Sequence, residues 1–234
     1  MWETAVDGRT LRFHLAGINN QNFIMQDDET GTWWQQVTGE AFLGPLKGRR
    51  LTSVPQDQLT FATWRSEAPQ GRVLKRDERI ARAGLYAPVN WERDMLKYQT
   101  PASASADTRL TPRALVVGVA LNGAATAYPV DALAAASATL DTVGGEPIVI
   151  VRAPDTRSTR VFDRRVDGRP LQFAVKIGAP PLRLLDVETG SEWDFTGMGV
   201  TGPLAGRRLR RTPFLEEYWF DWKTYHPTTQ VFRH

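Results

Sequence analysis

Four side chains near the N-terminus have types and spacing suited to binding a polar ligand. Trp34, Gln36 and Glu40 lie at even spacing, so a straight β-strand would place them on one face, because successive strand side chains alternate. Asn22 would join them from across a hairpin. A Trp beside amide and carboxylate groups suits a polar ring or a sugar-like ligand. In the alternative interpretation, Asn22 and Gln36 only cap loops or satisfy backbone groups.

These residues lie within an internal repeat. Three segments of a first copy recur in a second copy: 6–13 as 166–173, 29–34 as 188–193, and 44–51 as 202–209. The offset between the copies changes only from 160 to 158, which favours a duplication over chance. A duplication predicts two halves that share one fold.

The copies differ at the candidate site. The second copy replaces the polar groups, with Phe195 for Gln36, Met198 for Glu40, and Pro181 or Leu182 near the position of Asn22. Both copies keep an Asp and a Trp: Asp27 with Trp34, and Asp186 with Trp193. Groups kept in both copies are expected to serve the shared fold. Groups kept only in the first copy are candidates for binding.

The composition excludes several kinds of site. The chain has no Cys and only three His, at positions 14, 226 and 234, so we expect no thiol chemistry, no metal and no cofactor. The 29 Lys and Arg residues nearly balance 26 acidic residues and occur in short pairs, which argues against nucleic-acid binding. No apolar run approaches the roughly 20 residues that cross a membrane, and no signal peptide is visible.

The remaining local signals indicate strands and turns. Asp7-Gly8, Asn122-Gly123 and Asp167-Gly168 are typical of hairpin turns between alternating segments. We therefore predict a mainly β protein with two related β-rich, barrel- or sandwich-like halves. A few short helices are expected at 58–67, 131–139 and 216–225. The expected domains are a first repeat at 1–75, a linker at 76–109 and a second repeat at 110–234.

Several motifs of the second copy also occur together in one known family. They are NGAATAYP at 122–129, DTVGGEP at 141–147, FDRRVDGRPLQF at 162–173, GPLAG at 202–206 and HPTT at 226–229. On these motifs the chain resembles the bacterial domain of unknown function 3179, in tandem copies of which the first is truncated. The resemblance implies an uncharacterised protein in a periplasmic or secreted location.

The second copy departs from the family pattern where chemistry would reside. Family members carry Cys-Pro-x-Cys-Gly-Thr before the Phe-x-Arg hairpin, where this chain has Ala153 and Thr156 in place of the two Cys. They also favour a His-Glu pair where this chain has Ala136-Ser137. If the family chemistry uses those thiols and that imidazole, the second copy cannot perform it.

The first copy lacks the segment that precedes the repeat in the second. Strand-like runs at 147–151 and 159–162 have no counterpart before residue 6. We therefore expect an incomplete first repeat with an uncovered strand edge near residues 6–13. Uncovered edges invite pairing with another chain.

Two classes of function remain open. One is an extracytoplasmic ligand-binding or scaffold protein, with a groove beside the first copy that takes a small polar ligand. The other is a fragment of a thiol- or metal-dependent redox enzyme whose active segment lies upstream of Met1. No residue stands out as catalytic.

Overall fold

The computed structural model describes residues 1–234 except 20–21, 99, 101–106, 135, 179–180 and 234. The described residues form twenty strands in six sheets, with five short helices. The predicted mainly β fold class is therefore confirmed. The barrel-like alternative is not found, because the strands of these described sheets are arranged in open rows and none closes on itself.

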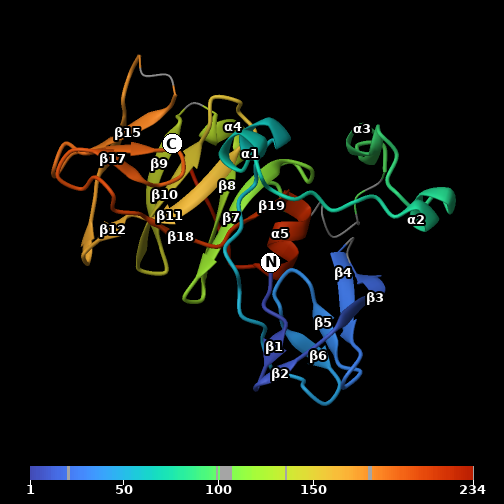
Figure 1. The fold of residues 1–234 in the computed structure, drawn as a ribbon. Coiled ribbons are helices and arrows are strands. Elements are labelled where there is room, and N and C mark those ends of the chain that lie inside the picture. Colours follow the sequence, from blue (N-terminus) through green and yellow to red (C-terminus); the bar gives the residue numbers. More distant parts are fainter. Residues whose placement is uncertain (20–21, 99, 101–106, 135, 179–180, 234) are drawn as a thin grey trace.

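The N-terminal half begins with a hairpin and continues as a four-stranded meander (Figure 1). Strand β1 (Ala5–Val6) pairs with β2 (Arg9–Thr10). At the turn, Asp7 and Gly8 have φ values of 49° and 77°, as a tight hairpin with two left-handed residues requires. The meander strands follow in order: β3 (Phe13–Asn19), β4 (Asn22–Asp27), β5 (Trp33–Gln35) and β6 (Ala41–Leu43).

The C-terminal half contains the same series of elements. Its hairpin pairs β12 (Arg165–Val166) with β13 (Arg169–Pro170). Its meander strands are β14 (Phe173–Val175), β15 (Arg183–Asp186), β16 (Glu192–Asp194) and β17 (Gly199–Thr201). The repeated sequence segments thus form the same strand order, while descent of the two halves from one duplicated ancestor stays a prediction.

Each meander contains one buried Trp that is bonded to a buried Asp. Trp34 Nε1 donates a 2.8 Å hydrogen bond to Asp27 Oδ2, and Trp193 Nε1 donates one of 2.8 Å to Asp186 Oδ2. Both indoles are fully buried, and a buried N–H without a partner would cost about 1–3 kcal/mol. This pairing explains why both segments keep these two residue types.

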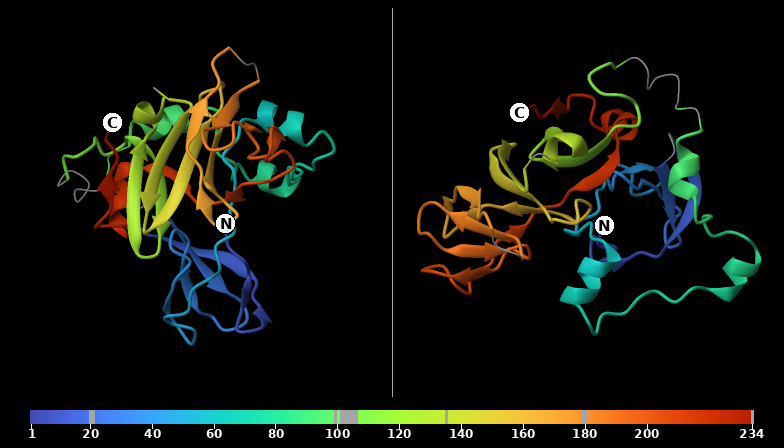
Figure 2. Two further views of the ribbon diagram at one scale, coloured as in Figure 1. Left: turned by 90° about the vertical axis from the view of Figure 1, so that its left-hand side faces the viewer. Right: turned by 90° about the horizontal axis from the view of Figure 1, so that it is seen from above.

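Two further sheets form the centre of the C-terminal half (Figure 2). One has the order β19, β7, β8, β20, and the other β18, β11, β10, β9. The first consists of Leu215–Tyr218, Leu115–Leu121, Ala124–Pro129 and Gln230–Val231. The second consists of Arg210–Arg211, Thr159–Asp163, Glu146–Arg152 and Ala138–Val143. Apolar side chains of both sheets share one buried core that includes Val117, Val119, Ile148 and Ile150.

The helices are shorter than the sequence patterns predict. They are α1 (Phe61–Glu67), α2 (Glu78–Arg82), α3 (Trp91–Met95), α4 (Val130–Leu133) and α5 (Trp219–Tyr225). The expected helices at 131–139 and 216–225 each lose residues to a neighbouring strand, β9 and β19 respectively. Sheet pairing outweighs helix propensity there, because propensity is a weak local preference. Among the described residues, no helix is both long and apolar enough to cross a membrane.

The segment between the halves extends away from the sheets (Figures 1 and 2). Helices α2 and α3 lie on it, and α2 buries none of its side chains. Leu74 and Val89 are almost wholly exposed, and Tyr86, Trp91 and Tyr98 are also exposed. The domain boundaries at 75 and 110 stay predictions.

A buried Arg joins the two halves. Arg160 on β11 is 2% exposed at its side chain and contacts two carboxylates of the N-terminal half. Its Nε lies 3.0 Å from Asp57 Oδ2, and its Nη2 lies 2.5 Å from Glu67 Oε2. The guanidinium also lies over the Phe195 ring. This contact fixes α1 against the second central sheet.

Candidate functional site

The two halves face each other across a cleft that is built around Trp2. The Trp2 indole donates a 2.7 Å hydrogen bond from Nε1 to the backbone oxygen of Gln36. Its ring lies against Gly39, where an added Cβ would come within 2.8 Å of the ring atom Cζ3. Trp2 also forms a backbone bridge with Ser53. Trp2 is therefore held by both side chain and backbone, and two hollows share it as a wall.

The first hollow has a volume of about 420 Å³, and we name it the Gln36 hollow. Its polar lining comes from both halves: Thr4, Gln36 and Gln56 from the first, and Glu217 on β19 from the second. Small-molecule sites typically measure about 300–1,000 Å³ and combine apolar walls with a few converging polar groups. The Gln36 hollow has this size and this mixture.

A tight turn places Gln36 at the hollow. Strand β5 ends at Gln35, because Gly39, at φ 68°, reverses the chain. The turn is closed by hydrogen bonds of 2.8 Å from Gly39 N to Gln35 O and from Gln35 N to Glu40 O. The straight strand that would align Trp34, Gln36 and Glu40 on one face is therefore absent from this described segment. That expectation was wrong, since a left-handed Gly interrupts the alternation.

The structure separates the four predicted site residues. Gln36 lines the hollow. Trp34 is fully buried and bonded to Asp27, so it lines no surface. Glu40 is exposed, with its Oε2 3.0 Å from Arg50 Nη2. The idea of one concavity formed by all four residues therefore needs correction, because Trp34 serves the core of the meander.

The fourth predicted residue, Asn22, contacts the C-terminal half. Its Nδ2 donates a 2.9 Å hydrogen bond to Asp221 Oδ1 on α5. Burial raises the pKa of Asp221 to about 6, against the attraction of Arg113. Burial also raises the pKa of Glu217 to about 7, and the nearby Asp221 carboxylate raises it further. Two carboxyls with raised pKa values thus face the polar residues of the first meander.

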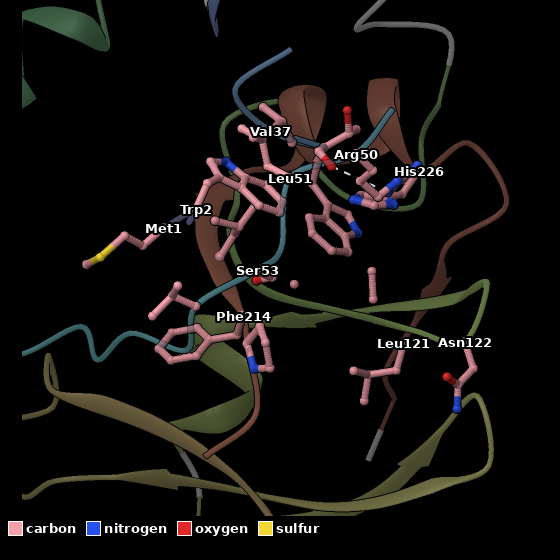
Figure 3. A pocket seen from close by; sticks show the side chains of 17 residues that line it. Met1, Trp2, Val37, Arg50, Leu51, Ser53, Leu121, Asn122, Phe214 and His226 are labelled. Carbon is pink, nitrogen blue, oxygen red and sulfur yellow. Dashed lines mark hydrogen bonds between the residues drawn. The ribbon is translucent and has the colours of Figure 1, made fainter. Parts of the chain in front are cut away.

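The second hollow has a volume of about 310 Å³ (Figure 3), and we name it the His226 hollow. The His226 ring lies 3.9 Å from the Trp222 ring, measured between centroids. Burial lowers the pKa of His226, and the positive charge of Arg50 lowers it further. Arg50 is held by Glu40 and by the backbone oxygen of Thr38. Aromatic rings therefore wall the His226 hollow, and its surroundings favour the neutral form of the imidazole.

The sequence patterns did not identify Glu217 and Asp221 as site residues. Both fall within 216–225, which was expected to be one helix. The strand β19 instead alternates its side chains, which turns Glu217 toward the N-terminal half and Glu216 toward Arg152 and Arg157. If residues 215–218 are assigned to a strand, the alternation predicts that Glu216 and Glu217 face opposite sides, and this is the signal that could have found Glu217.

The loop at 153–158 has a structural role in this chain. Asp155 Oδ2 accepts hydrogen bonds from the hydroxyls of Thr60 at 2.8 Å and Thr63 at 2.9 Å. The loop thereby anchors the first turn of α1. Ala153 and Thr156 stand where family members carry Cys, and neither side chain can bind a metal as a thiolate. Within the described part of the chain, no group of three or more His, Asp or Glu side chains could hold a metal ion.

The fold and the cleft define a β-rich protein with a ligand-sized hollow between two halves. The chain belongs to the family described as a protein of unknown function (DUF3179), whose model matches residues 1–229. This confirms the family assignment made from the motifs. The match runs through both halves and the segment between them, and separate tandem family copies stay a prediction. No curated protein and no solved structure matches the chain.

Proposed function

We propose that this protein binds a small polar ligand in the Gln36 hollow. The observation that carries the proposal is the convergence of polar groups from both halves on one cavity. Gln36 and Gln56 offer amide donors and acceptors. Glu217 offers a carboxyl whose Oε2 is buried and has no hydrogen-bond partner within the described structure. A buried polar atom without a partner is rare, and a ligand donor at the Glu217 carboxylate would lessen that deficit.

The side chain of Gln36 supports a binding role better than a structural one. It is exposed, and the hydrogen bonds of Gln36 with the Trp2 indole and with the Phe23 backbone oxygen use only the backbone atoms of Gln36. The C-terminal half has Phe195 at the matching position, packed against its apolar core. The meander therefore tolerates an aromatic residue at this turn, and its folding does not require the Gln36 amide.

The proposal extends to an extracytoplasmic location, and this part is supported by the family resemblance alone. Cell fractionation of the native host protein tests it. Recovery with periplasmic or secreted markers would support the location, and recovery with cytosolic markers would contradict it. The binding proposal stands independently of this result.

Ligand-observed and protein-observed NMR test the binding proposal. A panel of small sugars, polyols, amides and amines would be screened against the labelled chain, with the Trp2 indole signal as the reporter. This signal is well placed because Trp2 Nε1 donates to the Gln36 backbone oxygen at the wall of the hollow. Ligands that shift it, and whose affinity falls in Gln36→Phe, support the proposal. Hits that bind Gln36→Phe as tightly as the native chain would contradict it.

A further inference from the structure

The charge inside the Gln36 hollow is unbalanced. Glu217 is the only ionisable side chain among the described residues that line it. Met1 also lines it, and burial lowers the pKa of the Met1 amino group. Lowering favours the neutral amine. The hollow therefore presents one carboxyl without an Arg or Lys side chain in its lining to neutralise it.

The neighbours of Glu217 leave its carboxyl available. Asp221, four positions later on α5, has the same sign and already accepts the Asn22 amide. Arg113, the cation that attracts Asp221, is held elsewhere: its Nη2 donates 2.8 Å to Tyr98 O, and its guanidinium lies over the Tyr218 ring. The surroundings of Glu217 thus favour an incoming positive charge.

The walls of the hollow suit the hydrocarbon part of a cationic ligand. Trp2, Phe13 and Met25 line it together with Leu51 and Leu215. Aromatic faces attract ammonium groups by about 0.5–2 kcal/mol, depending on desolvation. The thioether of Met25 adapts to irregular ligand shapes. The negative charge of Glu217 and the apolar walls therefore both favour a cationic ligand that carries a hydrocarbon group.

We propose that the Gln36 hollow takes an organic ammonium ion, with its nitrogen at the Glu217 carboxylate and its hydrocarbon against Trp2 and Phe13. This inference rests on the proposed function and names its ligand class. The amide oxygens of Gln36 and Gln56 accept the remaining N–H groups. A charged hydrogen bond of this kind is roughly twice as strong as a neutral one.

Proton linkage follows from the environment of Glu217. Its pKa of about 7 in the free protein means that part of the population is protonated near neutral pH. An ammonium ligand binds the carboxylate form and so releases a proton. Affinity is expected to rise from pH 6 to pH 8 and to level off above that, provided that the ligand itself stays charged.

The test compares benzylammonium with benzyl alcohol, which has a similar shape and no charge, by calorimetry and by the Trp2 indole signal. Glu217→Gln removes the charge and keeps the shape. Glu216→Gln is the matched control, because Glu216 lies on the same strand, faces away from the hollow and also has a buried Oε2 without a partner among the described residues.

We expect benzylammonium to bind the native chain and Glu216→Gln equally, and Glu217→Gln at least about tenfold more weakly, since about 1.4 kcal/mol corresponds to a factor of ten. If benzyl alcohol binds equally well and Glu217→Gln has no effect, the ammonium inference is overturned while the binding proposal stands. If neither compound nor any of the screened polar ligands shifts the Trp2 signal, both are overturned.

Discussion

Asn22 Nδ2 donates a 2.9 Å hydrogen bond to Asp221 Oδ1, and the two residues are 199 positions apart. One is on β4 of the first meander and the other on α5. This bond closes one side of the contact between the halves. A second hydrogen bond, 3.2 Å from the Tyr225 hydroxyl to the Asn19 backbone oxygen, joins α5 to β3 of the same meander. The position of the first meander over Glu217 therefore depends on contacts across the whole length of the chain.

Replacing Gln36 by Phe should weaken ligand binding and leave the fold intact. The Gln36 side chain is exposed, so the free energy of unfolding should change by less than about 1 kcal/mol. Urea unfolding and NMR titration with any ligand found in the screen measure the two effects. Unfolding of Gln36→Phe would show that Gln36 is a structural residue and would refute the site.

Stability should fall as the pH rises from about 4 to about 7. Asp221 and Glu217 have pKa values of about 6 and about 7 in the folded protein, above those expected in the unfolded chain. A group whose pKa is raised in the folded protein stabilises the fold at low pH. This stabilisation is lost as the pH rises through the pKa of the folded state. Urea unfolding at several pH values measures the slope.

The pH effect has a matched control. Glu217→Gln should flatten the slope between pH 4.5 and 7 and gain stability at pH 8, of the order of 2 kcal/mol. Burial raises the pKa of Asp163, but hydrogen bonds from Arg165 and Arg210 outweigh this and lower the pKa to about 2. Asp163 therefore acts in the opposite direction below pH 4. The contribution of Asp163 to the pH dependence is the same in the native chain and in Glu217→Gln. An identical slope in Glu217→Gln would contradict the assignment.

Arg160→Ala should be strongly destabilising. Removal of this buried guanidinium leaves Glu67 without its partner and leaves Asp57 paired with Arg211 alone at the junction of the halves. Loss of one member of a buried ion pair costs about 3–5 kcal/mol. Chemical unfolding measures the loss. Arg79→Ala is the control, because its pair with Asp77 is exposed and should contribute less than about 1 kcal/mol.

Thr156→Gly should stabilise the protein. Thr156 has a φ of 58°, a conformation that costs a β-branched residue of the order of 1 kcal/mol and costs Gly little. Its side chain is exposed, so no packing is lost. Thr228→Gly, at an exposed Thr with ordinary φ, should instead lower the melting temperature. A lower melting temperature in Thr156→Gly would show that its strain is balanced by contacts of the hydroxyl or methyl group.

The edge of the first meander should exchange its amide protons rapidly. Strand β3 pairs with β4 and has no second neighbour among the described strands, and Leu15 and Ile18 on it are exposed. Hydrogen exchange measured by mass spectrometry should show β3 less protected than β10, which pairs on both sides. Strong protection of β3 in a chain that is monomeric by sedimentation would contradict this. Protection that appears only with rising concentration would identify pairing with another chain.

Much of the fold could be predicted from short-range patterns. Asp7-Gly8 and Asp167-Gly168 adopt the left-handed turns that their residue types favour. The Asp and the Trp that both copies keep were expected to serve the shared fold, and they form the same hydrogen bond in both meanders. These features depend on neighbours within a few residues, where backbone sterics and hydrogen bonding act directly.

The candidate site depended on tertiary structure. The even spacing of Trp34, Gln36 and Glu40 predicted that the three side chains share one face of a strand. In the structure Gly39 reverses the chain, and Trp34 is buried in the core of the meander. Only the packing of the halves brings Gln36 to the same cavity as Glu217. No local preference encodes that meeting, because it results from many apolar and polar contacts between distant segments acting together. The sequence by itself determined the turns, the strands and the family, and the tertiary structure alone decided which polar groups face each other.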